Sequence, residues 1–262
     1  MALKPYQQDF ARFLTETGSL FFREGLVLKD GRPSPYFVNM GRLCTGKLSF
    51  SLGSFFVRRL LELDRLTEVD ILLGPSYKGS AIAQAMAINF WTEHRKELFF
   101  EYDRKEFKDY GEASGQKNLM VNNSFFDGCG IWIVDDVGTS MATKYELLQK
   151  IEREGEQKKI SVRVVGLCLG IDRQQTTACY DSTGKVIPGK KGEDALQRFT
   201  ETTGVAVYSI APISEVVDYL FKEQIPVQVQ GAWQPISASL KKVFDAYLEE
   251  YGTHLTRKYV RR

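Results

Sequence analysis

The chain has 262 residues, a formal net charge of +2, and 26% charged against 43% hydrophobic residues. These totals are typical of a globular protein that buries a core, and so balanced a charge gives no reason to expect a nucleic-acid partner. The four cysteines form no CxxC pair, which argues against a zinc site, and no apolar run approaches the length of a membrane span. Because the chain starts without a signal peptide, we expect a cytoplasmic protein that does not contact membranes.

The first part of the chain predicts a helix followed by an antiparallel hairpin. Residues 5–17 have the apolar spacing of a short helix, and the turn pair Asp30-Gly31 stands between the apolar runs of residues 25–43. We expect residues 1–45 to form a small hood beside an α/β core of residues 46–262, the two together making a single domain.

After this hairpin, helical and strand patterns alternate along the chain. The predicted helices cover residues 48–63, 80–93, 143–154 and 193–203, and the predicted strands cover residues 69–73, 98–102, 131–134, 162–169 and 205–210. Apolar strands separated by helices predict a central parallel sheet with helices on both faces. Residues 174–195 predict an added hairpin with a turn near residues 182–184, to which we assign no function.

Unusual residues follow four of the five predicted strands, where parallel sheets bind their ligands. They are residues 74–79 and 103–105, the pair Asp135 and Asp136, and the pair Asp172 and Arg173. The glycines of residues 74–79 let backbone N–H groups approach an anion, and Lys78 adds a positive charge. The basic residues of segment 103–118 suit either a solvated surface loop or a dense negative charge that develops in a reaction. The fork of Arg173 suits either a planar carboxylate of a ligand or a salt bridge to a neighbouring acid.

The stretch CGIWIVDDVGTSMATK, residues 129–144, combines a buried strand, two adjacent acids, a loop of small residues and the start of a helix. Backbone N–H groups of such a loop can hold a phosphate, while the acids can accept hydrogen bonds from sugar hydroxyls or face Mg²⁺. A phosphorylated sugar is the ligand that combines these features. The alternative is that the two acids bind no ligand and only cap the next helix.

Two other families also place acids after a buried strand. A haloacid-dehalogenase-type phosphatase requires Asp-x-Asp, which Val137 excludes. A P-loop NTPase requires Ser or Thr after its Gly-Lys pair, and the near match GRLCTGKL has Leu48 there, which cannot bind Mg²⁺. The spacing therefore favours a third group of enzymes.

The chain resembles the type I phosphoribosyltransferases and, among them, the orotate phosphoribosyltransferase family. The motifs that carry the resemblance are LKDGRPSPYFVN, GPSYKG, DRKEFKDYGE and IVDDVGTS. The resemblance implies the type I phosphoribosyltransferase fold and a pentosyl transfer in pyrimidine nucleotide biosynthesis. In this reaction the phosphoribosyl group of 5-phosphoribosyl 1-pyrophosphate (PRPP) passes to orotate, giving orotidine 5'-monophosphate and pyrophosphate. A PRPP-binding regulator on the same fold, or a phosphoribosyltransferase for another base, is the alternative.

The resemblance also implies roles for individual residues. The implied orotate-binding residues are Lys29, Tyr36, Phe37, Thr139 and Arg173, the last on the carboxylate. The implied PRPP-binding residues are Tyr77, Lys78, Arg104, Lys105, Lys108, Tyr110, Asp135, Asp136, Val137, Gly138, Thr139, Ser140, Met141, Ala142 and Thr143. The implied catalytic residues among them are Arg104, Lys105, Lys108, Asp135 and Asp136.

Further expectations concern the cofactor, the assembly and the departures from the family pattern. Mg²⁺ would be held mainly by PRPP, pyrophosphate and water, and a homodimer would carry the lid loop 103–118 into the neighbouring subunit's site. A cis peptide between Ser76 and Tyr77 is also implied.

Tyr110 replaces the family's histidine and stays neutral near pH 7, with a reference pKa of about 10. Met141 and Ala142 replace a glycine and a threonine, which narrows the backbone geometry and removes a hydroxyl.

Overall fold

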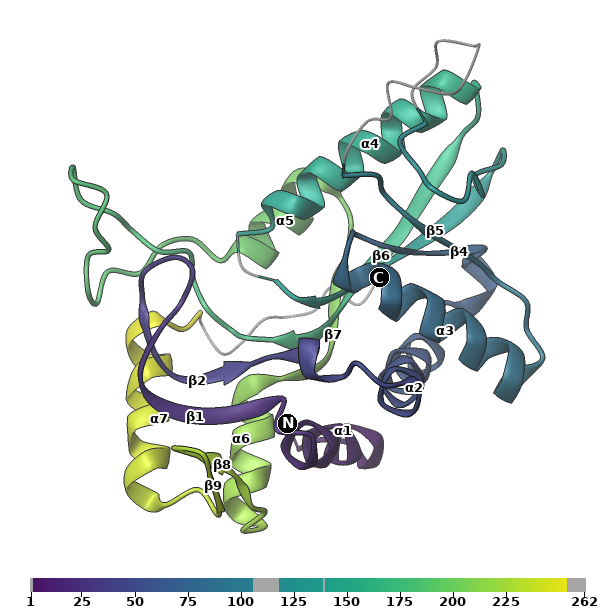
Figure 1. Ribbon diagram of the computed structural model, residues 1–262. Coiled ribbons are helices and arrows are strands. Elements are labelled where there is room, and N and C mark those ends of the chain that lie inside the picture. Colours follow the sequence, from purple (N-terminus) through teal and green to yellow (C-terminus); the bar gives the residue numbers. More distant parts are fainter. Residues whose placement is uncertain (1, 106–117, 139, 254–262) are drawn as a thin grey trace. The chain divides into compact units, whose positions relative to one another are not determined.

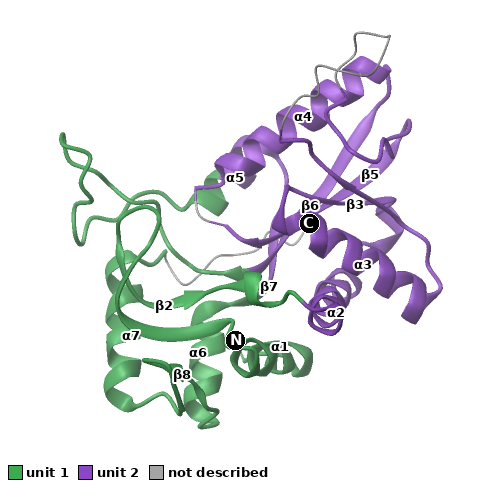
Figure 2. Cartoon of the chain, viewed as in Figure 1, with its two compact units in different colours: residues 1–44, 171–198, 211–262 green, residues 45–170, 199–210 purple. Residues whose placement is uncertain are grey.

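The computed structural model describes residues 2–105, 118–138 and 140–253. The predicted site residues Lys108, Tyr110 and Thr139, with most of the loop 103–118, lie outside these ranges. The chain divides into two compact units (Figure 2): unit 1 comprises residues 1–44, 171–198 and 211–262, and unit 2 comprises residues 45–170 and 199–210.

Unit 2 is built on a five-stranded sheet with the order β4-β3-β5-β6-β7. Its strands are β3 (Ile71–Gly74), β4 (Phe99–Tyr102), β5 (Cys129–Val137), β6 (Val162–Asp172) and β7 (Val207–Pro212), and the last residues of β6 and β7 belong to unit 1. Strand β3 pairs in parallel with both β4 and β5. All five predicted strands are present, so the prediction of an α/β fold around a parallel sheet is confirmed.

Helices cover both faces of this sheet. They are α2 (Gly46–Glu62), α3 (Lys78–His94), α4 (Ala142–Lys158) and α5 (Ala195–Thr203), and a short 3₁₀ turn, η2, spans Leu66–Glu68. Helix α3 packs on strands β3, β4 and β5 and carries α2 on its outer side, whereas α4 lies across the opposite face (Figure 1). The strands are apolar and almost continuously buried because helices cover them from both sides.

The core of unit 2 contains a close packing contact that only a glycine permits. Trp132 of β5 is fully buried and stacks on Tyr208 of β7, with 5.5 Å between the ring centroids. Gly166 of β6 lies beneath the indole, where an added Cβ would come within 2.6 Å of a Trp132 ring carbon. The indole therefore needs the missing side chain at position 166.

Unit 1 contains a second sheet with the order β2-β1-β8-β9. Its elements are α1 (Pro5–Glu16), β1 (Leu20–Val27), β2 (Pro33–Val38), the 3₁₀ turn η1 (Met40–Arg42), α6 (Ile213–Lys222), β8 (Val227–Val229), β9 (Ala232–Gln234) and α7 (Ala238–Tyr251). Strands β1 and β2 form the predicted antiparallel hairpin, and β8 adds to β1 in parallel.

Unit 1 is assembled from three stretches of the chain, in which residues 171–198 and 211–262 join residues 1–44. The reason is that α6 packs on α1, β8 extends the sheet at β1, and α7 packs on β2. The turn predicted near residues 182–184 is also present, since the Gly184 N–H donates to the carbonyl of Asp181 at 3.1 Å.

Candidate active site

The loop between β3 and α3 carries the first group of predicted site residues. It turns so tightly that a Cβ on Gly74 would come within 1.9 Å of the Gly79 carbonyl oxygen, so the sequence needs a glycine there. The peptide bond between Ser76 and Tyr77 is cis, as the resemblance implied. Tyr77 is 76% exposed and Lys78 begins α3, so both side chains are available to a ligand.

The acid pair lies in the last residues of β5, which runs further than predicted and includes both aspartates. Lys78 Nζ donates to Asp136 Oδ2 at 2.8 Å, and Lys144 Nζ donates to Asp135 Oδ2. The remaining oxygens accept backbone N–H groups: Asp135 Oδ1 that of Asp136 at 2.9 Å, and Asp136 Oδ1 that of Val137 at 2.8 Å. Each aspartate is thus matched by a lysine, which is more than a helix cap requires.

The surroundings of Asp135 oppose its ionisation. Burial raises the pKa of Asp135, and the neighbouring Asp136 raises it further, whereas Lys144 acts in the opposite direction. Both aspartates are 8% exposed, so solvent screens these effects only weakly. Asp135 therefore depends on Lys144 to hold its negative charge.

The predicted phosphate loop leads from this pair into α4. Met141 adopts φ +61°, in the left-handed region that favours glycine, and its side chain is buried. Ser140, Ala142 and Thr143 are exposed at the start of the helix, where backbone N–H groups and the helix dipole favour an anion. The departure from the family's glycine thus keeps the left-handed turn that a glycine would allow.

A hydrogen-bond network joins three elements beside this loop. Asp103, at the end of β4, accepts the Ser76 N–H at 2.7 Å and the Lys150 ammonium of α4 at 2.5 Å. Lys150 also donates to the carbonyl oxygen of Arg104 at 2.8 Å, and the Arg104 N–H donates to the Leu119 carbonyl at 2.9 Å. The two ends of segment 103–118 are therefore tied to each other and to the β3–α3 loop.

The predicted orotate-binding residues belong to unit 1. Arg173 is 7% exposed, and its Nε and Nη2 atoms have no hydrogen-bond partner among the residues described. The guanidinium lies 5.4 Å from the ring centroid of Tyr36, a fully buried residue of β2. Burial raises the pKa of Tyr36 to about 12, so the phenol is neutral at pH 7 and does not neutralise Arg173. Lys29 is exposed and Phe37 is partly buried.

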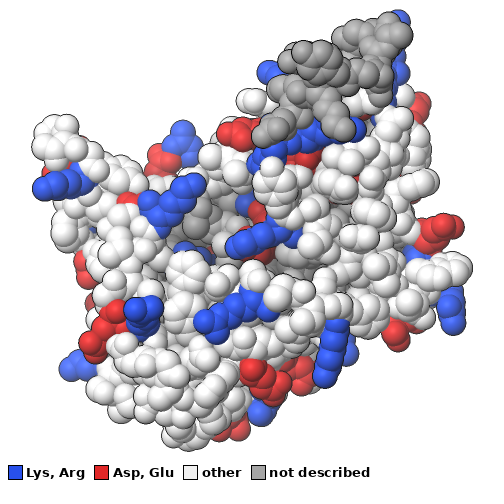
Figure 3. Space-filling model, viewed as in Figure 1, with Lys and Arg blue, Asp and Glu red and all other residues white. Residues whose placement is uncertain are grey.

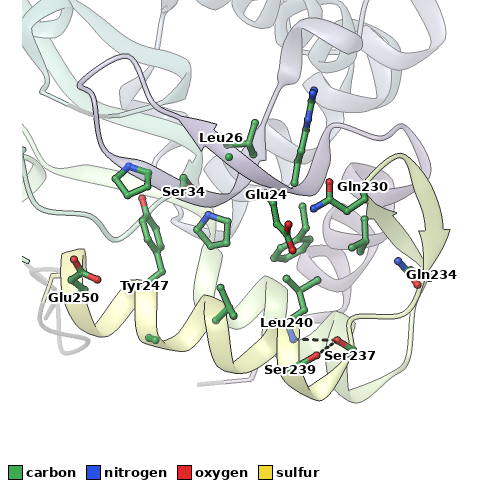
Figure 4. Close-up of a pocket in the computed structure, with 18 of the residues that line it drawn as sticks. Glu24, Leu26, Ser34, Gln230, Gln234, Ser237, Ser239, Leu240, Tyr247 and Glu250 are labelled. Carbon is green, nitrogen blue, oxygen red and sulfur yellow. Dashed lines mark hydrogen bonds between the residues drawn. The ribbon is translucent and has the colours of Figure 1, made fainter. Parts of the chain in front are cut away.

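A cavity of about 750 Å³ lies between the β1–β2 hairpin and α7 (Figure 4), but no described residue of the predicted site lines it. Within residues 2–105, 118–138 and 140–253, no cluster of three His, Cys, Asp or Glu side chains suits a metal ion, and no helix is long and apolar enough to cross a membrane.

Comparison with known proteins decides the family. No family model matches the chain. The chain is 31% identical to the orotate phosphoribosyltransferase of Bifidobacterium adolescentis over 247 residues, which span 93% of this chain and 96% of that relative. The chain belongs to the orotate phosphoribosyltransferase family. The orotate phosphoribosyltransferase of Chromohalobacter salexigens is likewise 31% identical over 256 residues, 97% of each chain.

Solved structures show the same fold. The crystal structure of orotate phosphoribosyltransferase from Francisella tularensis has a TM-score of 0.68 at 24% identity, and the match covers 94% of this chain and 100% of that one. The fold predicted from the sequence is thus the one that this family member adopts.

Two lysines of the site were not predicted from the sequence. They are Lys144 and Lys150. Both lie on α4, and Lys144 shares its buried face with Leu147 and Ile151, three and seven residues further on. A charged residue in an apolar stripe signals a buried partner, so the sequence held a sign of this ion pair.

Proposed function

We propose that the chain transfers the phosphoribosyl group of PRPP to orotate, forming orotidine 5'-monophosphate and pyrophosphate in pyrimidine nucleotide biosynthesis. The observation that carries the choice of base is Arg173, a buried guanidinium whose Nε and Nη2 have no partner among the described residues. These two atoms form the edge that binds a carboxylate in a bidentate manner. Orotate has this carboxylate, and uracil and the purine bases lack it.

The PRPP-binding role belongs to the strand ends of unit 2. The acid pair Asp135 and Asp136 faces the ribose hydroxyls, and the loop from Val137 to Thr143 holds the 5-phosphate with its backbone N–H groups. Tyr77 and Lys78 contact the pyrophosphate. Lys78 suits this role because its side chain is 57% exposed and its ion pair with Asp136 is therefore weakly held.

The reaction needs no covalent nucleophile from the protein. The bond between C1 of the ribose and the pyrophosphate oxygen breaks first, and its electron pair leaves with the pyrophosphate, giving an oxocarbenium-like centre. The orotate nitrogen then attacks C1 from the opposite face. Arg104, Lys105 and Lys108 stabilise the negative charge of the leaving group, so the protein acts by positioning and electrostatics.

Mg²⁺ is proposed to enter with PRPP rather than through a protein-built site. Both aspartates have lysine partners, and the described part of the chain offers no metal-binding cluster, so the residues present do not suit direct coordination. The diphosphate oxygens and water are hard ligands of the type that Mg²⁺ prefers.

The surface charges and the cysteines suggest how substrates are attracted and in which compartment the enzyme works. On the face shown in Figure 3, basic and acidic side chains are interspersed, which favours local anion sites over a broad basic surface. The cysteines at positions 44, 129, 168 and 179 are free thiols, which suits the reducing cytoplasm.

The substrate assignment is tested by mixing the protein with orotate, PRPP and Mg²⁺ and following the loss of orotate absorbance. Uracil and hypoxanthine serve as controls with the same PRPP concentration. We expect turnover with orotate and none with uracil or hypoxanthine. Turnover of the purine in place of orotate would overturn the substrate assignment and favour a phosphoribosyltransferase for another base.

A homodimer with exchanged lids is the proposed assembly, since the family resemblance places Lys108 in the neighbouring subunit's site. The test mixes two separately inactive variants, Lys108→Ala and Asp136→Asn, and measures activity after the subunits exchange. A shared site regains activity in mixed dimers, because one of the two sites then has both native residues. No recovery, with exchange shown by a tagged subunit, would place the lid in its own subunit.

A further inference from the structure

Lys144 occupies a place where a lysine is costly. It is 5% exposed and lies in the first turn of α4, at the positive end of the helix dipole. Its ammonium donates to Asp135 and to the carbonyl oxygen of Val137 at 3.4 Å. Replacing such a buried ion pair by apolar side chains is often neutral or stabilising, so stability alone gives no reason for this pair.

The two aspartates are held in unequal ways. Asp135 is bound on one oxygen by the buried Lys144 and on the other by the Asp136 N–H, so both its partners are fixed parts of the protein. Asp136 is bound by the Val137 N–H and by Lys78, whose side chain is 57% exposed. A ligand can displace an exposed lysine with little loss, whereas displacing Lys144 would leave a buried charge unpaired.

We propose that Lys144 is a positioning residue of the PRPP site, which neutralises and orients Asp135 and leaves Asp136 as the carboxylate that receives the ribose hydroxyls. This inference rests on the proposed function and assigns different roles to the two aspartates. Lys78 moves from Asp136 to the pyrophosphate when PRPP binds, while Lys144 stays on Asp135. The site then presents one unpaired carboxylate to the ribose instead of two adjacent unpaired carboxylates, which would repel the phosphates of PRPP.

The test replaces Lys144 by methionine, with Lys144→Arg as the conservative variant and Arg153→Met as the control. Arg153 is exposed on the same helix, so its removal takes away a cation without breaking this ion pair. We expect Lys144→Met to lower kcat/KM for PRPP by about 10–100-fold, the effect found for groups that orient the ligands of metal sites. KM for orotate should stay within about twofold, and Lys144→Arg should recover most of the loss.

A double variant separates positioning from a purely structural role. Lys144→Met with Asp135→Asn removes both charges of the buried pair, so we expect it to have a higher kcat/KM for PRPP than Lys144→Met alone. Lys144→Met with Asp136→Asn should show no such recovery, because Asp136 is the ligand-binding carboxylate. The double variant also serves if Lys144→Met alone fails to fold.

The outcomes separate this proposal from the proposed function. Equal losses for PRPP and orotate in Lys144→Met, or recovery by Asp136→Asn instead of Asp135→Asn, would overturn the positioning role. An unchanged PRPP affinity in Lys144→Met, measured by calorimetry with PRPP and Mg²⁺, would do the same. Failure of the parent protein to turn over orotate would instead remove the proposed function, and calorimetry would still report on the role of Lys144 in PRPP binding.

Discussion

Replacing Arg173 by methionine should separate stability from orotate binding. In the free protein the guanidinium is 7% exposed and its Nε and Nη2 have no partner among the described residues, so burying them costs about 1 kcal/mol each or more. The contact with the Tyr36 ring, at 5.4 Å, returns about 1 kcal/mol. Methionine keeps an apolar side chain in the site and loses both contributions. The free energy of unfolding should therefore rise by about 1 kcal/mol, which corresponds to about 2–4 °C in Tm.

The same change should damage catalysis with orotate. Two charge-assisted hydrogen bonds to a carboxylate contribute about 1.5 kcal/mol each at the lower end, together about 3 kcal/mol, which is about 100-fold in kcat/KM. KM for PRPP should change little, because Arg173 has no role in PRPP binding. The preference for orotate over uracil should fall by a similar factor, since only orotate has the carboxylate.

The assay combines thermal unfolding with steady-state kinetics on orotate and uracil. Stability and activity must move in opposite directions for the reasoning to hold. A variant that unfolds several degrees lower while keeping its kcat/KM for orotate would show that Arg173 is a structural residue and that its unpaired atoms bind no substrate.

Three further predictions concern stability and are measured by urea unfolding. Glu101 is fully buried and accepts five hydrogen bonds, two of them from Ser124, so Glu101→Gln should cost about 2–3 kcal/mol by turning an NH₂ group toward donors. Met141→Gly relieves about 1–2 kcal/mol of left-handed backbone strain but loses a buried side chain worth about 1.5–3 kcal/mol, so a small net loss of stability is expected. Burial raises the pKa of Asp30, but hydrogen bonds from Arg32 outweigh it and hold the pKa below its usual value. The Arg32 pairing therefore stabilises fully above about pH 4 and is lost as pH falls through the lowered pKa, so the destabilisation by Arg32→Met should be larger at pH 7 than at pH 3.

The sheet of unit 2 was predictable because each strand is a short apolar run between helices. The predicted ends of the strands were less accurate. Strand β5 continues through Val137 because its polar end stays buried and hydrogen-bonded. Strands β8 and β9 of unit 1 were not predicted. Each has three residues, and β8 pairs with a strand about 200 positions earlier in the chain. Pairing over such a separation leaves no local pattern. Helix α7 did have one, since Phe244, Tyr247 and Tyr251 share a buried face, and it was overlooked.

Residue types in the candidate site were easier to predict than their partners. The motifs placed Lys78 and Asp136 at neighbouring strand ends, and the structure shows them in contact at 2.8 Å. They gave no indication that Lys144 would reach back to Asp135, because that contact depends on how α4 packs on the sheet. A motif specifies which groups occur near a ligand, whereas packing decides which of them are already paired.

The phosphate loop shows how packing can replace a family residue. Met141 keeps the left-handed turn at a cost of about 1–2 kcal/mol, and the burial of its side chain, worth about 1.5–3 kcal/mol, offsets that cost. The backbone N–H groups that bind phosphate are then retained, since they depend on the path of the chain and not on a glycine as such. The hydroxyl missing at Ala142 is not supplied by Lys144, whose ammonium is held by Asp135. The exposed hydroxyls of Ser140 and Thr143 are consequently the described side chains that can replace it.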